Sequence, residues 1–125
     1  MAWNGIGIGW PNATSGGIPP VVGKTINIQI NVNSGDGYWS VYNTVTGDFR
    51  QGTSSANITY IIPFGSTINL NGSANTGGSY NGVEIYSVYY GLLIINEREN
   101  NEAAAGYAYS VPDVDDQITM TIYSN

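Results

Sequence analysis

Residues 24–33 read Lys-Thr-Ile-Asn-Ile-Gln-Ile-Asn-Val-Asn, so apolar and polar side chains alternate along the whole stretch. Successive side chains of an extended chain point to opposite faces, which places the isoleucines on one face and the amides on the other. This period of two is typical of a strand with one buried and one solvent-exposed face. It predicts a protein built from sheets that each cover one side of a core.

Similar segments continue along the chain. The turn-like residues 33–37 are expected to join this first strand to the next as a hairpin. Residues 96–105 are the one helix candidate, ended by Gly106, although a charged loop fits them equally well. Short strands without helices between them predict an all-β protein, a sandwich or a barrel. Beyond the first strand, we predict β segments at 38–45, 56–62, 66–71, 83–95, 106–111 and 117–123.

Composition agrees with this fold class and bounds the size. The chain has 125 residues with 17 Gly, 10 Tyr and only 10% charged residues, and Tyr favours strands as Gly favours turns. This length suits one domain with one core. We assign residues 24–125 to the β-sandwich domain. Residues 1–23 are rich in Gly and Pro, and we predict an extended arm that contacts its own sheet, a neighbouring subunit or lipid.

Charge and residue types exclude several functions. The net charge is -6 with three Lys and Arg, whereas nucleic acids and anionic membranes are held by clustered cations. The absence of Cys and His excludes thiol nucleophiles, disulfides and the common metal sites. We therefore expect no nucleic-acid partner, no cofactor, no metal ion and no enzymatic activity.

Acidic residues are the remaining candidates for catalysis or metal binding. Glu84 lies in an apolar segment, where burial would raise its pKa, but the outer face of a strand is the favoured interpretation. Asp113, Asp115 and Asp116 offer oxygens to a calcium ion, yet their spacing matches no calcium loop, and a solvated turn is preferred.

The chain shows no membrane or export signal. No apolar run approaches the ~18 residues that cross a bilayer, and the start Met-Ala-Trp-Asn-Gly lacks the features of a signal peptide. We expect a soluble protein without a transmembrane segment, either cytoplasmic or the mature form of an exported protein.

Tyrosines are concentrated in the second half of the chain. Tyrosine presents an apolar ring with a polar tip, which suits stacking on a sugar or enclosing a quaternary ammonium. A single tyrosine is more often a half-buried sheet residue, but the group together indicates a binding face. The group consists of Tyr80, Tyr86, Tyr89, Tyr90, Tyr107 and Tyr109.

An ordered series of short elements resembles the front part of the actinoporins, the cytolysins of sea anemones, whose β-sandwich is shared by fungal fruit-body lectins. The similarity covers about residues 24–123. The elements are Ile26-x-Ile28-x-Ile30-x-Val32, Asn33-Ser34-Gly35, Trp39, Asn43-Thr44, Phe49-Arg50-x-Gly52-Thr53-Ser54, Pro63-x-Gly65, Leu70-Asn71-Gly72, Gly82-Val83, Ser110-Val111-Pro112 and Ile122-Tyr123.

This resemblance implies an actinoporin-like sandwich whose one end binds phosphocholine or a sugar. The family's pocket borders the turn at 50–54, where Gln51 would line it, and Ser110 and Pro112 match two further positions. The amphipathic pore helix of the toxins has no counterpart in residues 1–23. With the nearby tyrosines, the predicted ligand-binding residues are Arg50, Gln51, Thr53, Ser54, Tyr86, Tyr107, Tyr109, Ser110 and Pro112.

These observations predict a lectin-like recognition protein without catalysis. Its expected ligand is a neutral glycan or a zwitterionic lipid head group at a membrane surface, because hydroxyls, amides and aromatic faces bind uncharged groups. Two alternatives remain open: a self-assembling structural β protein, which would form homo-oligomers through exposed sheet edges, and an actinoporin-like pore-forming cytolysin.

Overall fold

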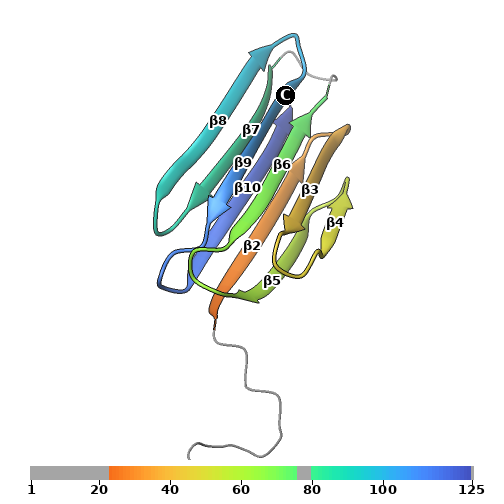
Figure 1. Ribbon diagram of the computed structural model, residues 1–125. Coiled ribbons are helices and arrows are strands. Elements are labelled where there is room, and N and C mark those ends of the chain that lie inside the picture. The colour runs from red at the N-terminus through yellow and green to blue at the C-terminus, as the bar shows by residue number, and fades with distance from the viewer. Residues whose placement is uncertain (1–22, 76–79, 125) are drawn as a thin grey trace, which may run out of the picture.

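The computed structural model describes residues 23–75 and 80–124, so the arm predicted at 1–23 lies outside the described residues except for Gly23. The described residues form nine strands and no helix (Figure 1). One sheet has the order β5-β2-β10-β7-β8, and the second has the order β4-β3-β6-β9. The strands are β2 (Lys24–Asn33), β3 (Gly37–Asn43), β4 (Phe49–Gly52), β5 (Ala56–Ile62), β6 (Thr67–Ala74), β7 (Tyr80–Ser87), β8 (Gly91–Glu99), β9 (Ala103–Ser110) and β10 (Asp116–Ser124).

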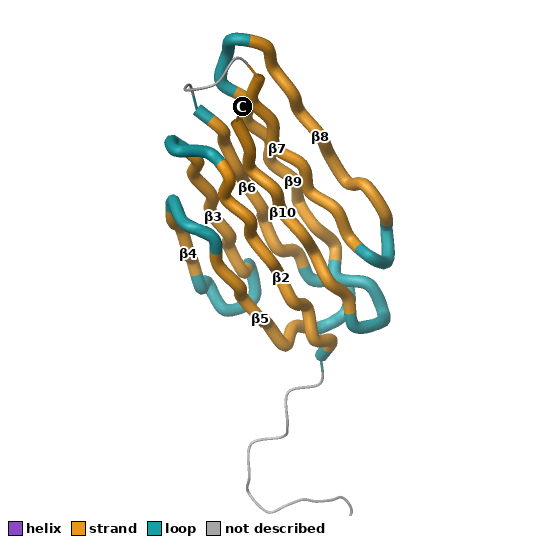
Figure 2. Tube along the Cα trace, turned by 180° about the vertical axis from the view of Figure 1, so that it is seen from behind, coloured by secondary structure: helices purple, strands orange, loops and turns teal. Residues whose placement is uncertain are grey.

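The two sheets face each other as the layers of a sandwich (Figure 2). The all-β sandwich prediction is therefore confirmed, while the actinoporin-like subtype stays a prediction. The isoleucines of β2 and the apolar residues of β10 point into one core, where Ile28 and Ile118 are fully buried partners in the register. Burying one such side chain stabilises the fold by roughly 1.5–3 kcal/mol, so these two strands contribute a large share of the stability.

The predicted hairpin between β2 and β3 is wrong. β2 pairs antiparallel with β5 and parallel with β10, whereas β3 pairs with β4 and β6 in the other sheet. The turn 34–36 therefore carries the chain from one layer to the other. Gly37 makes this crossing possible, because a Cβ at that position would lie 2.7 Å from Val32 Cγ1 and 3.0 Å from Ile122 Cγ2.

The helix considered for 96–105 is also wrong. These residues instead form the end of β8, a turn, and the start of β9, with Asn100 at a φ of 55° in the turn. Small side chains let β9 pack closely, since Ala103 is fully buried opposite Ala74 of β6. Packing of this kind overrides the helix propensity of an alanine run. The single segment predicted at 83–95 is two strands, joined by the turn 88–90.

The strand directions gather the loops at two ends of the sandwich (Figure 1). At one end lie the turns 34–36, 53–55 and 100–102, and we call this the polar loop end. At the other end lie the loops 44–48, 63–66, 88–90 and 111–115, and we call this the apolar loop end. The register fixes this division, because Trp39, Ala74 and Ala103 lie toward the first end and Asn43, Thr67 and Ser110 toward the second.

Candidate functional site

The outer face of the four-stranded sheet carries only uncharged side chains. In β3 the buried residues Trp39 and Val41 alternate with residues that point outward. Paired residues of an antiparallel sheet share a face, so the strand register defines the whole surface. We call it the four-strand face, and its members are Tyr38, Ser40, Tyr42, Phe49, Gln51, Thr67, Asn69, Asn71, Ser73, Ala104, Gly106, Ala108 and Ser110.

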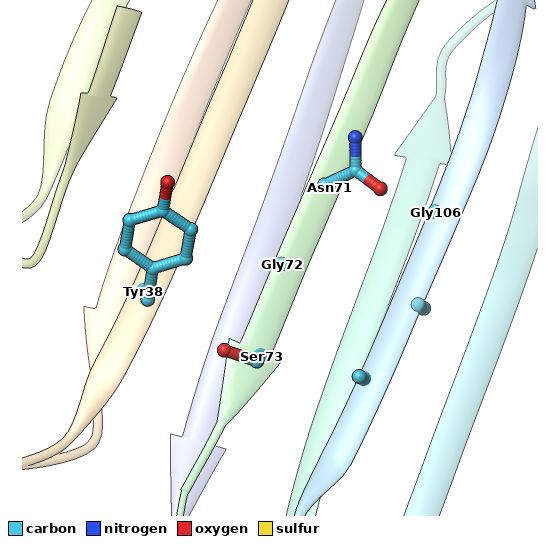
Figure 3. A pocket seen from close by; sticks show the side chains of 7 residues that line it. Tyr38, Asn71, Gly72, Ser73 and Gly106 are labelled. Carbon is cyan, nitrogen blue, oxygen red and sulfur yellow. The ribbon is translucent and has the colours of Figure 1, made fainter.

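This face contains a hollow of about 360 Å³ (Figure 3). Tyr38 stands at one side of it, Asn71 and Ser73 of β6 lie in the middle, and Gly106 of β9 lies at the other side. The hollow depends on the missing side chain at Gly106, since a Cβ there would lie 2.4 Å from Asn71 Oδ1. Ala104, also on β9, contributes only a methyl group to the same side of the hollow.

Tyr38 is held in place by a hydrogen bond. Its hydroxyl donates to Oε1 of Gln51 on the neighbouring strand β4 at 2.6 Å. The ring remains 39% exposed, so its face is open to solvent beside the hollow. A fixed, exposed aromatic ring is suited to binding because little rotamer freedom is lost when a ligand packs on it.

Sequence reasoning placed Gln51 and Ser110 on the binding surface, and both lie on the four-strand face. It missed the hollow itself. The signals that point to it are the polar residues Asn69, Asn71 and Ser73 at alternate positions, and the small residues from Ala103 to Gly106 together with Ala108. Neither signal says on which side of the protein these residues lie, because that depends on which strands become neighbours.

Arg50 lies on the opposite side of β4. It pairs with the buried Val41 and therefore points toward the other sheet, at the sandwich edge between β4 and β5. Its Nε lies 3.1 Å from Oδ2 of Asp48, and the same oxygen accepts the hydroxyl of Tyr60 of β5 at 2.7 Å. Burial, followed by this hydrogen bond to Asp48, raises the pKa of Tyr60 well above its usual value. The hydrogen bond between Tyr60 and Asp48 links the two sheets at this edge, and Arg50 pairs with the same carboxylate from its own side of the sandwich.

We expect the substitution Arg50→Gln to have only a small effect. The ion pair is about half exposed, so screening limits its contribution to about 0–1 kcal/mol. Urea unfolding should show a loss within that range. Any ligand binding on the four-strand face should be unchanged because Arg50 points away from it. A loss of binding in this variant would contradict the placement of Arg50 outside the binding surface.

The other ligand-binding residues predicted from the turn at 50–54 and from the Ser110-Val111-Pro112 segment lie at opposite ends of the sandwich. Thr53 and Ser54 are exposed at the polar loop end, where the carbonyl of Ser54 accepts the indole N–H of Trp39 at 2.8 Å. Ser110 and Pro112 lie at the apolar loop end, and Pro112 is buried. These two groups are separated by the length of the strands, so the structure does not bring them into one pocket.

The predicted tyrosines are also dispersed. Tyr86 is 42% exposed on the outer side of the five-stranded sheet, beside Thr119 of β10. Tyr107 pairs with the buried Leu70 and packs against the core. Tyr109 is fully buried. The three rings therefore belong to three environments, and Tyr38, which the sequence had not singled out, is the tyrosine beside the hollow.

Tyr109 belongs to a buried polar cluster around Asp116. Asp116 Oδ2 accepts the hydroxyls of Tyr109, at 2.6 Å, and of Ser87, while Oδ1 accepts the backbone N–H groups of Tyr89 and Gln117 at 3.0 and 2.8 Å. Ser87 Oγ in turn accepts the N–H of Tyr90 at 3.0 Å. The cluster holds the turn 88–90 at the apolar loop end. Its geometry indicates a structural role.

We expect stability to fall above about pH 10, where the tyrosines of an unfolded chain lose their protons. Burial, and then the hydrogen bond to Asp116, raises the pKa of Tyr109 in the folded state. The stability that this phenol contributes is present below its unfolded pKa and is lost as the pH rises beyond it. Urea midpoints at pH 8 and pH 11 should differ, and they should differ less in Tyr109→Phe. An equal loss in both proteins would contradict this account.

The acidic residues show no arrangement for a metal ion. Asp115 Oδ1 accepts the backbone N–H of Thr25 at 2.8 Å, and Asp113 lies 3.3 Å from the Lys24 ammonium. Within residues 23–75 and 80–124 no group of three potential ligands comes together. Glu84 lies opposite Thr121 on the outer side of the five-stranded sheet, as the sequence favoured.

The apolar loop end exposes large hydrophobic side chains on all four of its loops. Val45, Phe64 and Val114 are 53%, 63% and 45% exposed, and Val88 in the fourth loop is 67% exposed. Tyr89 and Tyr90 beside Val88 are exposed as well, with their rings in edge-to-face contact. Exposed apolar groups on separate loops at one end are a feature of interaction surfaces. In the described part of the chain, no helix is long and apolar enough to cross a membrane.

Comparison with known proteins finds no related family and two distant structural neighbours. No protein-family model and no curated protein matches the chain. Two solved structures are similar in fold, both of a bacterial adhesin from Mobiluncus mulieris containing intramolecular disulfide, isopeptide and ester bond cross-links. They have 14% sequence identity, TM-scores of 0.46 and 0.47, and cover 83% and 85% of this chain. This chain spans 42% of the adhesin chain, and a likeness at this level carries no information on function.

Proposed function

We propose that this protein is a non-catalytic, lectin-like recognition module that binds a neutral glycan on its four-strand face. The observation that carries the proposal is the hollow between the fixed ring of Tyr38 and the small residues of β9, with Asn71 and Ser73 between them. Binding sites of this kind combine an apolar surface with a few polar groups that fix the orientation of the ligand.

The chemistry of this face suits a sugar ring. The ring of Tyr38 offers an apolar surface for the C–H side of a sugar, and the side chains of Asn71 and Ser73 offer hydrogen-bond donors and acceptors for its hydroxyls. No side chain of the face carries a charge at neutral pH, so an ionic ligand would lose its hydration without finding a counter-charge. These properties support a neutral glycan over a charged one.

A glycan array followed by calorimetry tests the proposal. Neutral glycans should bind to the full chain, and Gly106→Val should abolish binding because its side chain fills the hollow and displaces the amide of Asn71. Valine is accepted in strands, so the variant should fold. Thr121→Val, on the outer side of the five-stranded sheet, is the matched control and should bind normally. An array without neutral glycan binders would remove the proposal.

A second candidate function is attachment to a zwitterionic membrane surface through the apolar loop end. The exposed residues Phe64, Val88 and Val114 support it, since apolar tips on several loops suit partial insertion between lipids. Asp113 and Asp115 are exposed at the same end, which disfavours anionic lipids.

Vesicle sedimentation tests this second function. The protein should sediment with phosphatidylcholine or sphingomyelin vesicles, and the double variant Phe64→Ser, Val88→Ser should remain in the supernatant. Both positions are exposed, so the variant should keep its fold. Dye release from the same vesicles would separate surface attachment from pore formation. Wild-type protein that stays in the supernatant would rule out attachment.

A further inference from the structure

The four-strand face repeats the same composition along its whole length. The register divides it into rows that run across the strands, each with an aromatic or amide group on one side and a small residue on the other. One row contains Tyr38, Ser73 and Ala104. The next contains Gln51 and Ser40 with Asn71 and Gly106.

A third row continues the pattern below the hollow. It contains Phe49, Tyr42, Asn69 and Ala108, so an aromatic pair again faces a polar residue of β6 and a small residue of β9. The rings of Tyr42 and Phe49 are 6.5 Å apart, and they are 39% and 52% exposed. Two exposed rings in contact form a continuous apolar surface, which is the kind of surface that a ligand can cover.

Along the strand direction, the side chains of these rows form three parallel lanes, one on β3 and β4, one on β6 and one on β9. The lane on β3 and β4 has aromatic rings in the first and third rows and polar side chains in the second. Polar side chains line β6, and residues with at most one methyl group line β9 from Ala104 to Ala108. The polar lane of β6 runs from Thr67 to Ser73, six residue steps, which is ~20 Å in a strand. This length is much greater than that of one sugar ring, and all of it is uncharged.

We propose that the ligand is an extended neutral polysaccharide chain that runs along the strands and fills the lane between the aromatic rings and β9. This inference rests on the function proposed above and names the form of its ligand. A ligand with a regular repeat matches a surface whose binding groups repeat, because polar side chains of β6 recur in every row and aromatic rings recur in the first and third rows. A binding site for a single terminal sugar needs the hollow alone, and the row of Tyr42 and Phe49 would then have no ligand contact.

Calorimetry with neutral oligosaccharides of increasing length tests this inference. Suitable probes are β-1,4-linked oligomers of glucose, N-acetylglucosamine, mannose and xylose with one to six units. For the oligomer that binds, the affinity should rise at least about tenfold between one and four units and then level off, as the face is filled.

The variant Phe49→Ser distinguishes the contribution of the third row from that of the hollow. It should reduce the affinity for four units severalfold and leave the affinity for two units unchanged, since two units fill the hollow at Tyr38. Ile61→Ser is the matched control, because Ile61 is 59% exposed against 52% for Phe49 but lies on the outer side of the five-stranded sheet. It should have no effect on any oligomer.

Three results would overturn the inference. Equal affinity for one unit and for four units would leave glycan binding in place but restrict the site to the hollow. Unchanged affinity of Phe49→Ser for four units would exclude the lower row. No binding to any neutral glycan, on the array or among these oligomers, would remove both the inference and the proposed function.

Discussion

Replacing Asp116 with alanine should destabilise the protein by about 3–5 kcal/mol, the largest stability effect that we expect from a single substitution. The carboxylate is 8% exposed and accepts four hydrogen bonds. Its removal leaves the hydroxyls of Ser87 and Tyr109 and two backbone N–H groups without their acceptor. Such a loss is a large fraction of the stability of a domain of this size.

Urea unfolding measures this effect, because the midpoint should fall while the slope with denaturant stays constant. Asp115→Ala is the matched control one residue earlier. Its carboxylate is exposed and accepts one backbone N–H, so its removal should cost less than about 1 kcal/mol. Tyr109→Phe should fall between the two because it removes a single donor to the carboxylate. Equal stability of Asp116→Ala and Asp115→Ala would show that the cluster is not needed for the fold.

Replacing Tyr38 with alanine should weaken glycan binding by about 10- to 100-fold, the largest effect on binding that we expect from an exposed aromatic residue. The substitution removes the ring beside the hollow and the partner of Gln51. Since the ring is 39% exposed, the fold should lose little stability. The dissociation constant is measured by calorimetry with the glycan that the array identifies.

Tyr86→Ala is the matched control for Tyr38→Ala. Tyr86 is 42% exposed but lies on the outer side of the five-stranded sheet. The two variants change the same kind of residue at nearly the same exposure, so they differ only in the face that is altered. If Tyr86→Ala weakens binding and Tyr38→Ala does not, the ligand lies on the other sheet.

The local sequence pattern was sufficient to predict most strands but not which strands pair with each other. The alternation of Ile26, Ile28 and Ile30 predicts both the strand and its buried face, because the period of two is a property of the extended chain itself. The turn 34–36 has the composition of a hairpin, yet it connects two sheets. Turn residues fix a change of direction, whereas the partner of each strand depends on packing between distant segments.

The same distinction explains the outcome for the candidate site. The residues of the turn at 50–54 are close in sequence, but alternation sends Gln51 to the four-strand face and Arg50 toward the other sheet. Tyr109 was predicted to contact the ligand as one of a group of tyrosines. It lies on the inner face of β9 opposite the buried Ile68, and Asp116, at the start of the next strand, accepts its hydroxyl.

The sequence by itself determined the fold class, the apolar side of most strands and the lack of charge that disfavours ionic ligands. These properties follow from residue types and their periodicity, which act over a few neighbouring positions. Only the tertiary structure decided that Tyr38, Asn71 and Gly106 lie together, since they come from three strands whose order in the sheet is set by the shared core. A surface that is assembled from separate strands has no continuous sequence signal, because only the strand register brings its residues together.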